Sequence, residues 1–341
     1  MKYSSPSFSV LVDGYDLTPA LIENSSQVNE NVTQMTAPFG TTSEGHEPNG
    51  TSKAALSVGG GIFDQAIDPL HAGKIPDGGV GVSRVACIFN EGQAKGKHFT
   101  AYEGAYSQKS EALGVLGQLT KANVAYLPSG QVDDGVILQE LAAKTADWNT
   151  ESTPFDIADD PGQRHIDIVS SSIEAGDTSV ITTLGHHHLV TGDMVAIFTH
   201  ASVVPDINDN PTAAEAWKLI GHSITVTGDH TFSIPVNVTD AGTGGYCVLV
   251  SRASGGYGYS QVVQGSGFTN YIGKIRHSAD ASSWADLITF ADTAMSYHAK
   301  ERKATATPTT RWNRYWAWDG NVTGAVGATP FKVFGGFARG V

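Results

Sequence analysis

The chain has 341 residues, of which 40% are hydrophobic, 16% are charged and 39 are glycine. This composition excludes a disordered chain and is typical of an ordered, turn-rich protein that is long enough for roughly two or three domains. The net charge of −13 argues against ordinary nucleic-acid binding, because an acidic surface repels the phosphate backbone.

The charge is unevenly distributed along the chain. Residues 1–160 contain 9 basic and 20 acidic residues, residues 161–250 contain 2 and 9, and residues 251–341 contain 10 and 5. The net charges of the three segments are therefore −11, −7 and +5. Solubility is the simplest explanation of the two acidic segments.

The sequence contains no targeting or membrane signal that we could identify. The N-terminal sequence MKYSSPSFSV is mostly polar, and no apolar run approaches the ~18 residues that a membrane helix needs. We therefore expect a protein that is soluble when made. Cys87 and Cys247 lie far apart in segments with strand character, which is typical of buried, reduced thiols rather than of a disulfide framework.

The N-terminal part of the chain alternates strand and turn signals. Ser7–Leu17 predicts a half-buried strand that runs into a turn at Asp13-Gly14. The polar stretch Asn24–Ser52 predicts a loop too long for a simple connection, so we expect it to contact a partner. Gly79–Phe89 and Gly96–Tyr106 predict a long antiparallel hairpin.

The next segments complete a first predicted domain. Ser110–Thr120 could form a short helix or another strand, and its two glycines weaken the helix. Ala122–Leu127 and Gly135–Gln139 predict two more strands. The sequence then turns polar, with the turn signal DDPG ending in Gly162. Residues 1–160 are therefore predicted to form a β-rich domain with at most one or two helices.

Two further β-rich segments follow. Short strands at near-regular spacing predict a small all-β module. Its predicted strands lie at Ile166–Val169, Ser179–Thr182, Asp193–Phe198, Ser223–Thr227 and Thr231–Ile234. After the glycine-rich stretch Ser254–Tyr259, alternation returns in Tyr271–Ser278, and this last part carries four of the six tryptophans.

The stretch GHHHLVTGD in the middle module raises the question of a metal site. In an extended chain His186 and His188 could share one face, whereas His187 could not join them. A structural zinc site needs four convergent nitrogen or sulfur ligands, and Cys247 has no CxxC partner. We predict a turn between two strands, closed by Gly192-Asp193, and no metal ligands. Three further histidines leave a metal site assembled by the fold open as an alternative: His200, His222 and His230.

Other motifs with known chemistry are incomplete. Asp206–Asn210 matches the first five positions of a calcium-binding loop, but Pro211 stands where glycine is needed and Trp217 where a bidentate glutamate is needed. The patterns GxGxxG, GxxxxGK[ST], HExxH and GxSxG do not occur. The sequence therefore predicts no enzyme, with no catalytic, cofactor-binding or metal-binding residues and no cofactor.

An aromatic stripe lies near the C-terminus. In the sequence RWNRYWAW, Trp312, Trp316 and Trp318 share one face of an extended strand, with Arg311 and Tyr315 on the other. Such a stripe can stack on sugar rings, but a β-sandwich core buries the same residues and gains ~1.5–3 kcal/mol per large side chain. We expect a core. The alternative is a carbohydrate-binding or adhesion protein that uses the stripe as its platform.

Three groups of motifs together resemble one known family. The opening FSVLVDGYDLTPALIENSSQVNENVTQMTAPFG, followed by GGGIFDQ, resembles the first strand, long loop and second strand of the major tail tube proteins of long-tailed bacteriophages. The closing IRHSADASSWADLITF, AKERKATATPTTRWNRYWAW and FKVFGGFARG resemble the C-terminal β-sandwich of a subset of these proteins. GHHHLVTGDMVAIF and WKLIGHSITVTGDHTFSIPV resemble a small β module that is inserted into many phage structural proteins.

This resemblance implies a mainly β protein with three domains. Residues 1–160 would form a tail-tube-type β-sandwich or barrel with one or two short helices, residues 161–252 an inserted small all-β module, and residues 253–341 a C-terminal β-sandwich. The protein would be a structural component of the virion tail, made in the host cytoplasm. Hexameric rings would stack into the tube through which DNA passes to the host, with the outer domains displayed on the tail surface.

The resemblance also implies partners. These are other copies of the chain and other tail proteins, namely the tape measure, terminator and distal tail proteins. Genomic DNA would pass through a lumen lined by acidic groups of residues 1–160 without specific binding. The basic segment 251–341 would face outward, toward an anionic host surface, and host-surface glycans are a further candidate partner. No membrane insertion is expected. The alternative function is a carbohydrate-binding or adhesion protein of a virion.

Overall fold

The structure of the protein is a computed structural model. It describes the backbone and side chains of residues 9–16, 18, 83–103, 132–172, 178–201, 205–210, 220–263, 269–293, 299–324 and 331–340. It describes the backbone alone of residues 26–36, 45–62, 104–111, 121–128, 173, 264 and 294. Of the predicted helix or strand at Ser110–Thr120, all but the first two residues lie outside the described part of the chain.

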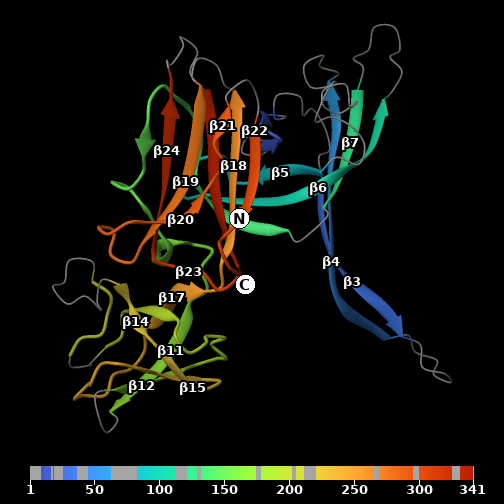
Figure 1. The fold of residues 1–341 in the computed structure, drawn as a ribbon. Helices are drawn as coiled ribbons and strands as arrows, with labels where there is room; N and C mark the ends of the chain where they lie inside the picture. Colours follow the sequence, from blue (N-terminus) through green and yellow to red (C-terminus); the bar gives the residue numbers. More distant parts are fainter. Residues whose placement is uncertain are drawn as a thin grey trace.

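The described strands form three antiparallel sheets of 11, 6 and 8 strands (Figure 1). Among the described residues, the short 3₁₀ helix η3 (Ile157–Asp159) is the helix with both ends described. The predicted mainly β fold is therefore confirmed. In the described residues no helix is long and apolar enough to cross a membrane.

The largest sheet joins the two ends of the chain. Its main path runs β2-β1-β5-β6-β8-β25-β18-β22. These strands are β1 (Ser9–Val12), β2 (Tyr15–Asp16), β5 (Ser83–Phe89), β6 (His98–Glu111), β8 (Asp133–Lys144), β18 (Gly256–Gln264), β22 (Ala299–Ala304) and β25 (Phe331–Arg339). Because β8 pairs with β25, strands from the segments 1–160 and 253–341 share one sheet. The division into three domains remains a prediction. Strands of the first and third segments nevertheless pair with each other in this sheet.

Two local predictions for this sheet are confirmed. β5 and β6 form the expected antiparallel hairpin, in register from Ser83↔Ala105 to Ile88↔Thr100. β1 turns into β2 at Asp13-Gly14, and both turn residues have positive φ, of 52° and 79°. This conformation suits an Asp-Gly pair, because glycine carries no Cβ and aspartate tolerates the left-handed region.

Four strands leave the large sheet as an arm. The second half of β6, residues 104–111, pairs with β7 (Lys121–Pro128), β7 pairs with β4 (Gly45–Ile62), and β4 pairs with β3 (Ser26–Thr36). Figure 1 shows β3 and the lower part of β4 extending away from the other strands. The predicted loop at Asn24–Ser52 is therefore wrong for most of its length, since it contains β3 and the start of β4. A strand with polar residues at most positions lacks the apolar alternation by which strands are recognised.

The six-stranded sheet packs against the large sheet as a sandwich. Its strands are β9 (Trp148–Asn149), β10 (Phe155–Asp156), β19 (Asn270–Ser278), β20 (Ala285–Thr289), β21 (Thr293–Ala294) and β24 (Tyr315–Thr323). The core between the sheets contains Trp312, Trp316 and Trp318, which are 1%, 1% and 0% exposed. The prediction that this stripe is core is confirmed. Tyr315, expected on the opposite face, is also buried.

A second core lies on the opposite face of the large sheet. It is rich in aromatic rings, with Phe334 making edge contacts to Phe89 at 4.9 Å and to Phe99 at 5.3 Å between ring centroids. Cys87 is fully buried in this core. Apolar contacts on both faces explain why β8, β18 and β25 have almost continuous buried runs instead of a simple alternation.

The eight-stranded sheet forms the middle module, at the lower left of Figure 1. Its strands are β11 (Ile166–Ile173), β12 (Ser179–Thr183), β13 (Met194–Phe198), β14 (His222–Ser223), β15 (Thr225–Gly228), β16 (Thr231–Ile234), β17 (Tyr246–Ala253) and β23 (Arg311–Trp312). A separate core of aliphatic residues, Phe232 and the buried Cys247 fills the module. Both cysteines are free and buried, as predicted.

Candidate functional site

The GHHHLVTGD stretch joins β12 to β13, as the turn prediction required. His187 is 3% exposed, its Nε2 lies 2.9 Å from the Gly228 carbonyl, and its Nδ1 accepts the Leu189 N–H at 2.9 Å. An imidazole that donates through one nitrogen and accepts through the other is neutral. His187 is therefore a structural side chain that ties the turn to the β15–β16 connection.

The neighbouring histidines face outward, on the opposite side from His187. His186 and His188 are exposed and their ring centroids lie 4.2 Å apart. Their predicted common face is thus observed. Among the described residues no three His, Cys, Asp or Glu side chains are grouped so that they could hold a metal ion.

The Gly192-Asp193 pair closes the turn through an ion pair. Asp193 is 1% exposed, accepts the Val190 N–H at 2.9 Å and binds Arg252 at 2.7 Å. Gly192 has φ 93°, in the region that favours glycine. Arg252 lies in β17, which continues into β18 of the large sheet through only two residues. The turn is therefore fixed to the strand that leads out of the module.

Basic residues of the C-terminal segment pair with acidic residues of the first two segments. The pairs are Lys300–Asp13, Arg302–Asp133, Arg276–Glu151, Arg314–Asp156, Arg339–Asp160, Arg252–Asp193 and Arg314–Asp209. These basic groups of residues 251–341 neutralise acidic groups of the same chain, and the outward orientation of the segment in a tail stays a prediction. Charge totals along the chain do not indicate which groups become neighbours on folding.

One residue of the incomplete calcium-binding motif, Asp209, also pairs with a basic residue of the C-terminal segment. Asp209 binds Arg314 and is 3% exposed, while Asp206 accepts the Asn208 N–H at 3.0 Å. Asp209 occupies the fourth position of the motif, which supplies no calcium ligand, and its carboxylate is directed at a guanidinium. Arg314 lies directly before β24, so this contact joins a loop of the module to the sandwich.

A second group of contacts holds the residues just before the module against the large sheet. His98 Nε2 lies 2.7 Å from Asp160, and Arg339 donates to Gln163 at 2.7 Å while its guanidinium lies 3.8 Å from Asp160. Asp160 is 2% exposed and also accepts the Gly162 N–H at 2.9 Å. The residues that lead into β11 are therefore held against β6 and β25.

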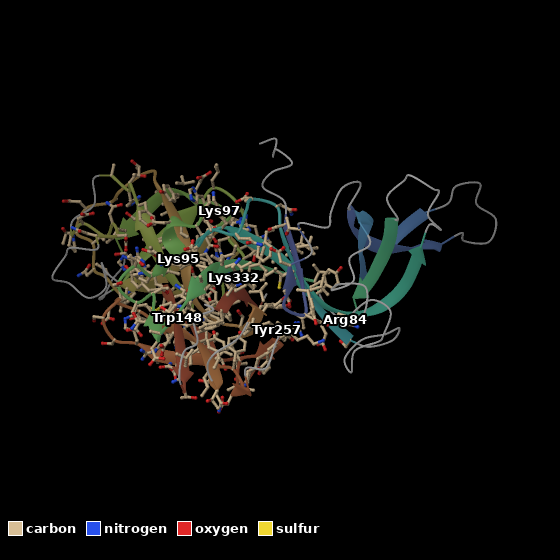
Figure 2. The ribbon with its side chains drawn as sticks, turned by 90° about the horizontal axis from the view of Figure 1, so that it is seen from above. Arg84, Lys95, Lys97, Trp148, Tyr257 and Lys332 are labelled. Carbon is tan, nitrogen blue, oxygen red and sulfur yellow. The ribbon has the colours of Figure 1, made fainter. Side chains whose placement is uncertain are left out.

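The root of the arm is fixed by a buried charge cluster. Arg84 is 1% exposed and binds Asp13 at 2.8 Å, and Lys300 binds the same carboxylate at 2.8 Å. Arg84 lies opposite Gly104 in the β5–β6 register, at the position where β6 turns toward β7. Figure 2 shows Arg84 at the base of the arm, with the rest of the side-chain-bearing body to one side. This cluster stabilises the point from which the arm extends.

The arm itself presents unpaired strand edges. In the described residues β3 pairs with β4 alone, and β4 pairs with β7 only from Leu56 to Ile62. Among the described strands, residues 45–55 of β4 therefore have a neighbour on one side only, and the outer edge of β3 has none. Open edges offer backbone N–H and C=O groups for pairing with another strand. This is the part of the described structure best suited to contact another chain.

Comparisons with known proteins do not place the chain in a family. No protein-family model matches it, and no curated protein matches it. Among solved structures, it is similar to SPP1 Dit (gp 19.1), described as a paradigm of the hub adsorption apparatus in phages that infect Gram-positive bacteria. The two chains share 9% identity, with 98% of this chain and 99% of that chain covered and a TM-score of 0.27. A TM-score of this size does not establish a common fold.

Proposed function

We propose that this protein is a structural subunit of a bacteriophage tail that assembles into a ring through its β-arm. The observation that carries the proposal is the β3–β4 hairpin, which leaves the body and has unpaired edges in the described structure. An open edge of this length would promote uncontrolled aggregation unless a defined partner covers it. A neighbouring copy in a closed ring is such a partner, because closure leaves no edge free.

The assignment to a phage tail rests on the sequence. The opening and closing motifs resemble those of tail tube proteins, and the arm coincides with the region Asn24–Ser52 for which the sequence already suggested a partner. The proposal assigns the protein a non-enzymatic role. Its partners are other copies of itself and neighbouring tail proteins, and its location is the tail of the virion.

The finer form of the proposal is a tail tube. Hexameric rings would stack head to tail, and acidic groups of residues 1–160 would line the lumen and keep passing DNA from adhering. A tail-tip hub, the kind of protein named for the similar solved structure, would instead form rings that do not stack. The two forms share the ring and differ in the contact between rings.

The rival carbohydrate-binding function loses its proposed platform. A sugar ring stacks on the exposed face of an aromatic side chain, but the indole rings of Trp312, Trp316 and Trp318 are at most 1% exposed. A glycan could reach them only if the sandwich opened. The ring-forming role therefore accounts better for the described structure.

Electron microscopy of the purified full-length chain tests the proposal. We expect rings in negative stain, together with a mass by light scattering that rises with protein concentration to a fixed multiple of the subunit. Long tubes would favour the tail tube, and separate rings would favour the hub. A monomer at every concentration, with no ring in the images, would contradict the proposal.

A further inference from the structure

A cavity of about 410 Å³ opens beside the sandwich. Its base is the face of β6, β8 and β25 on which His98, Val136 and Phe337 lie in one row across the three strands. Thr100 and Asp134 form the next row on the same face. A cavity of this size is within the usual range for a small-molecule site.

The cavity has an apolar floor and polar walls. Val136, Trp316 and Phe337 supply the floor, and each is at most 4% exposed. Asp160 and Gly162, which lead into the middle module, supply one wall, and the β5–β6 turn supplies another with Asn90. A floor of this kind favours a hydrocarbon chain, because each buried CH₂ gains about 0.8 kcal/mol.

The positive groups around the cavity already have partners. His98 lies at hydrogen-bond distance from Asp160, and Arg339 is held by Gln163 and lies near Asp160. Both cationic side chains are therefore directed at groups of the protein. An anionic ligand would have to compete with Asp160 for them.

Two polar groups remain open: the Asp134 carboxylate, which only accepts hydrogen bonds, and the Asn90 side-chain amide, which can accept or donate. Asp134 is exposed, and its Oδ1 accepts the Thr100 hydroxyl at 2.8 Å. In the described residues Asp134 has no cationic partner, and the side-chain amide of Asn90 makes no hydrogen bond. Three carboxylates line the cavity, those of Glu91, Asp134 and Asp160, against one guanidinium and one imidazole. The excess of carboxylates and the open acceptor of Asp134 both favour a cation.

We propose that this cavity binds a small aliphatic amine. The ammonium group would donate hydrogen bonds to the Asp134 carboxylate and to the Asn90 side-chain oxygen, and the hydrocarbon chain would lie on the apolar floor. A hydrogen bond between two charged groups is about twice as strong as one between neutral groups. An alcohol of the same length is therefore a weaker ligand, and a carboxylate is repelled. The site is independent of the ring assembly proposed above.

Three five-carbon compounds test this assignment on the full-length protein. Isothermal titration calorimetry with cadaverine, 1,5-pentanediol and glutarate keeps the chain length constant and changes the two end groups from cationic to neutral to anionic. We expect saturable binding of cadaverine, weakened by added salt because the interaction is electrostatic, and binding of the other two at least about tenfold weaker. Equal binding of the diol, tighter binding of glutarate, or no binding of cadaverine up to about 10 mM would overturn it.

A matched pair of variants locates the site. Asp134→Asn keeps the shape of an exposed side chain and removes its charge, so we expect the affinity for cadaverine to fall about ten- to hundredfold. Asp229→Asn removes a carboxylate that is 80% exposed in the module and does not line the cavity, so we expect unchanged affinity. Thermal melting checks that both variants fold. Unchanged binding in Asp134→Asn, or an equal loss in both variants, would contradict the assignment.

Discussion

The guanidinium of Arg314 binds the carboxylate of Asp209 through two parallel contacts, Nη1–Oδ1 at 2.5 Å and Nη2–Oδ2 at 3.0 Å. Both side chains are 3% exposed. Burial raises the pKa of Asp209, and Arg314 acts against this by favouring the charged form. The contact joins the module to the sandwich, so its loss affects both parts.

Replacing Arg314 with alanine leaves Asp209 buried without its cation. We expect the free energy of unfolding to fall by about 3–5 kcal/mol, measured by urea denaturation. Arg314→Lys retains the positive charge but cannot form two parallel hydrogen bonds to the carboxylate, so it should recover only part of the lost stability. Adding Asp209→Asn to the alanine variant should restore some stability, because the fully buried charge is then removed and only Asp156, which is 18% exposed, has lost its partner. Lys332→Ala, at an exposed position, is the control. A loss of under about 1 kcal/mol for Arg314→Ala would show that the pair does not stabilise the fold.

The His98–Asp160 pair predicts a stability that depends on pH. The hydrogen bond to Asp160 raises the pKa of His98, against a smaller lowering by burial. Burial alone would raise the pKa of Asp160, but His98 and the Gly162 N–H together lower it. A histidine whose pKa is raised in the folded state stabilises the fold below about pH 6.5, and this stabilisation is lost as the pH rises through the pKa of the folded state. A lowered aspartate pKa stabilises above about 3.9 and is lost as the pH falls.

The pair therefore contributes most between about pH 4 and 6.5. Thermal melts of the wild type and of His98→Gln should differ most near pH 5–6, and the difference should shrink toward pH 8.5. His188→Gln, at an exposed position of the module turn, serves as the control and should follow the wild type. A gap between wild type and His98→Gln that is constant, or that widens with rising pH, would contradict the assigned direction.

The sequence predicted those elements whose patterns are local. β5, β6, β8 and β19 have apolar runs bounded by turn residues, and the three tryptophans near β24 were correctly predicted to be core. β3 and the start of β4 were predicted as a loop, because their sequence is mostly polar and lacks the apolar alternation that marks a strand, whereas backbone pairing between the two strands leaves no such signal in the sequence. The Arg314–Asp209 pair could not be predicted, since 105 residues separate its members and only the folded chain brings them together. The cavity is likewise built from distant strands.

Gly335 is required by the packing of Trp318. A Cβ at this position would lie 2.4 Å from Cε3 and Cζ3 of the indole, and Trp318 is fully buried. We expect Gly335→Ala to destabilise the fold by about 1–3 kcal/mol through overpacking, measured by chemical denaturation. A Cβ added at the exposed Gly185 would meet nothing within 4 Å, so Gly185→Ala should stay within about 0.5 kcal/mol of the wild type. Similar costs for both variants would show that contact with the indole is not the cause.

The two thiols report on different parts of the fold. Burial raises the pKa of Cys247 to about 12 and raises that of Cys87 even further. Neither thiol is therefore reactive at neutral pH in the folded protein, because the thiolate is the reactive form. We expect a disulfide reagent such as DTNB to label Cys87→Ser and Cys247→Ser only as the protein unfolds in urea. If the module opens first, Cys247 is labelled at lower urea than Cys87. Rapid labelling of either variant without urea would contradict the buried positions.

Single prolines along β3 test the assembly edge. In an antiparallel pair, successive N–H groups point alternately toward the partner strand and away from it. Of Val28→Pro and Asn29→Pro, one removes an N–H that binds β4, and the other removes an N–H on the open edge. We expect the open-edge variant to lose ring formation in negative stain while its melting temperature stays that of the wild-type monomer. The other variant should also disrupt the hairpin, as reported by faster hydrogen exchange in residues 45–57. Asn29→Ala, which retains its N–H, should assemble normally. Rings formed equally well by both proline variants would rule out strand pairing through β3.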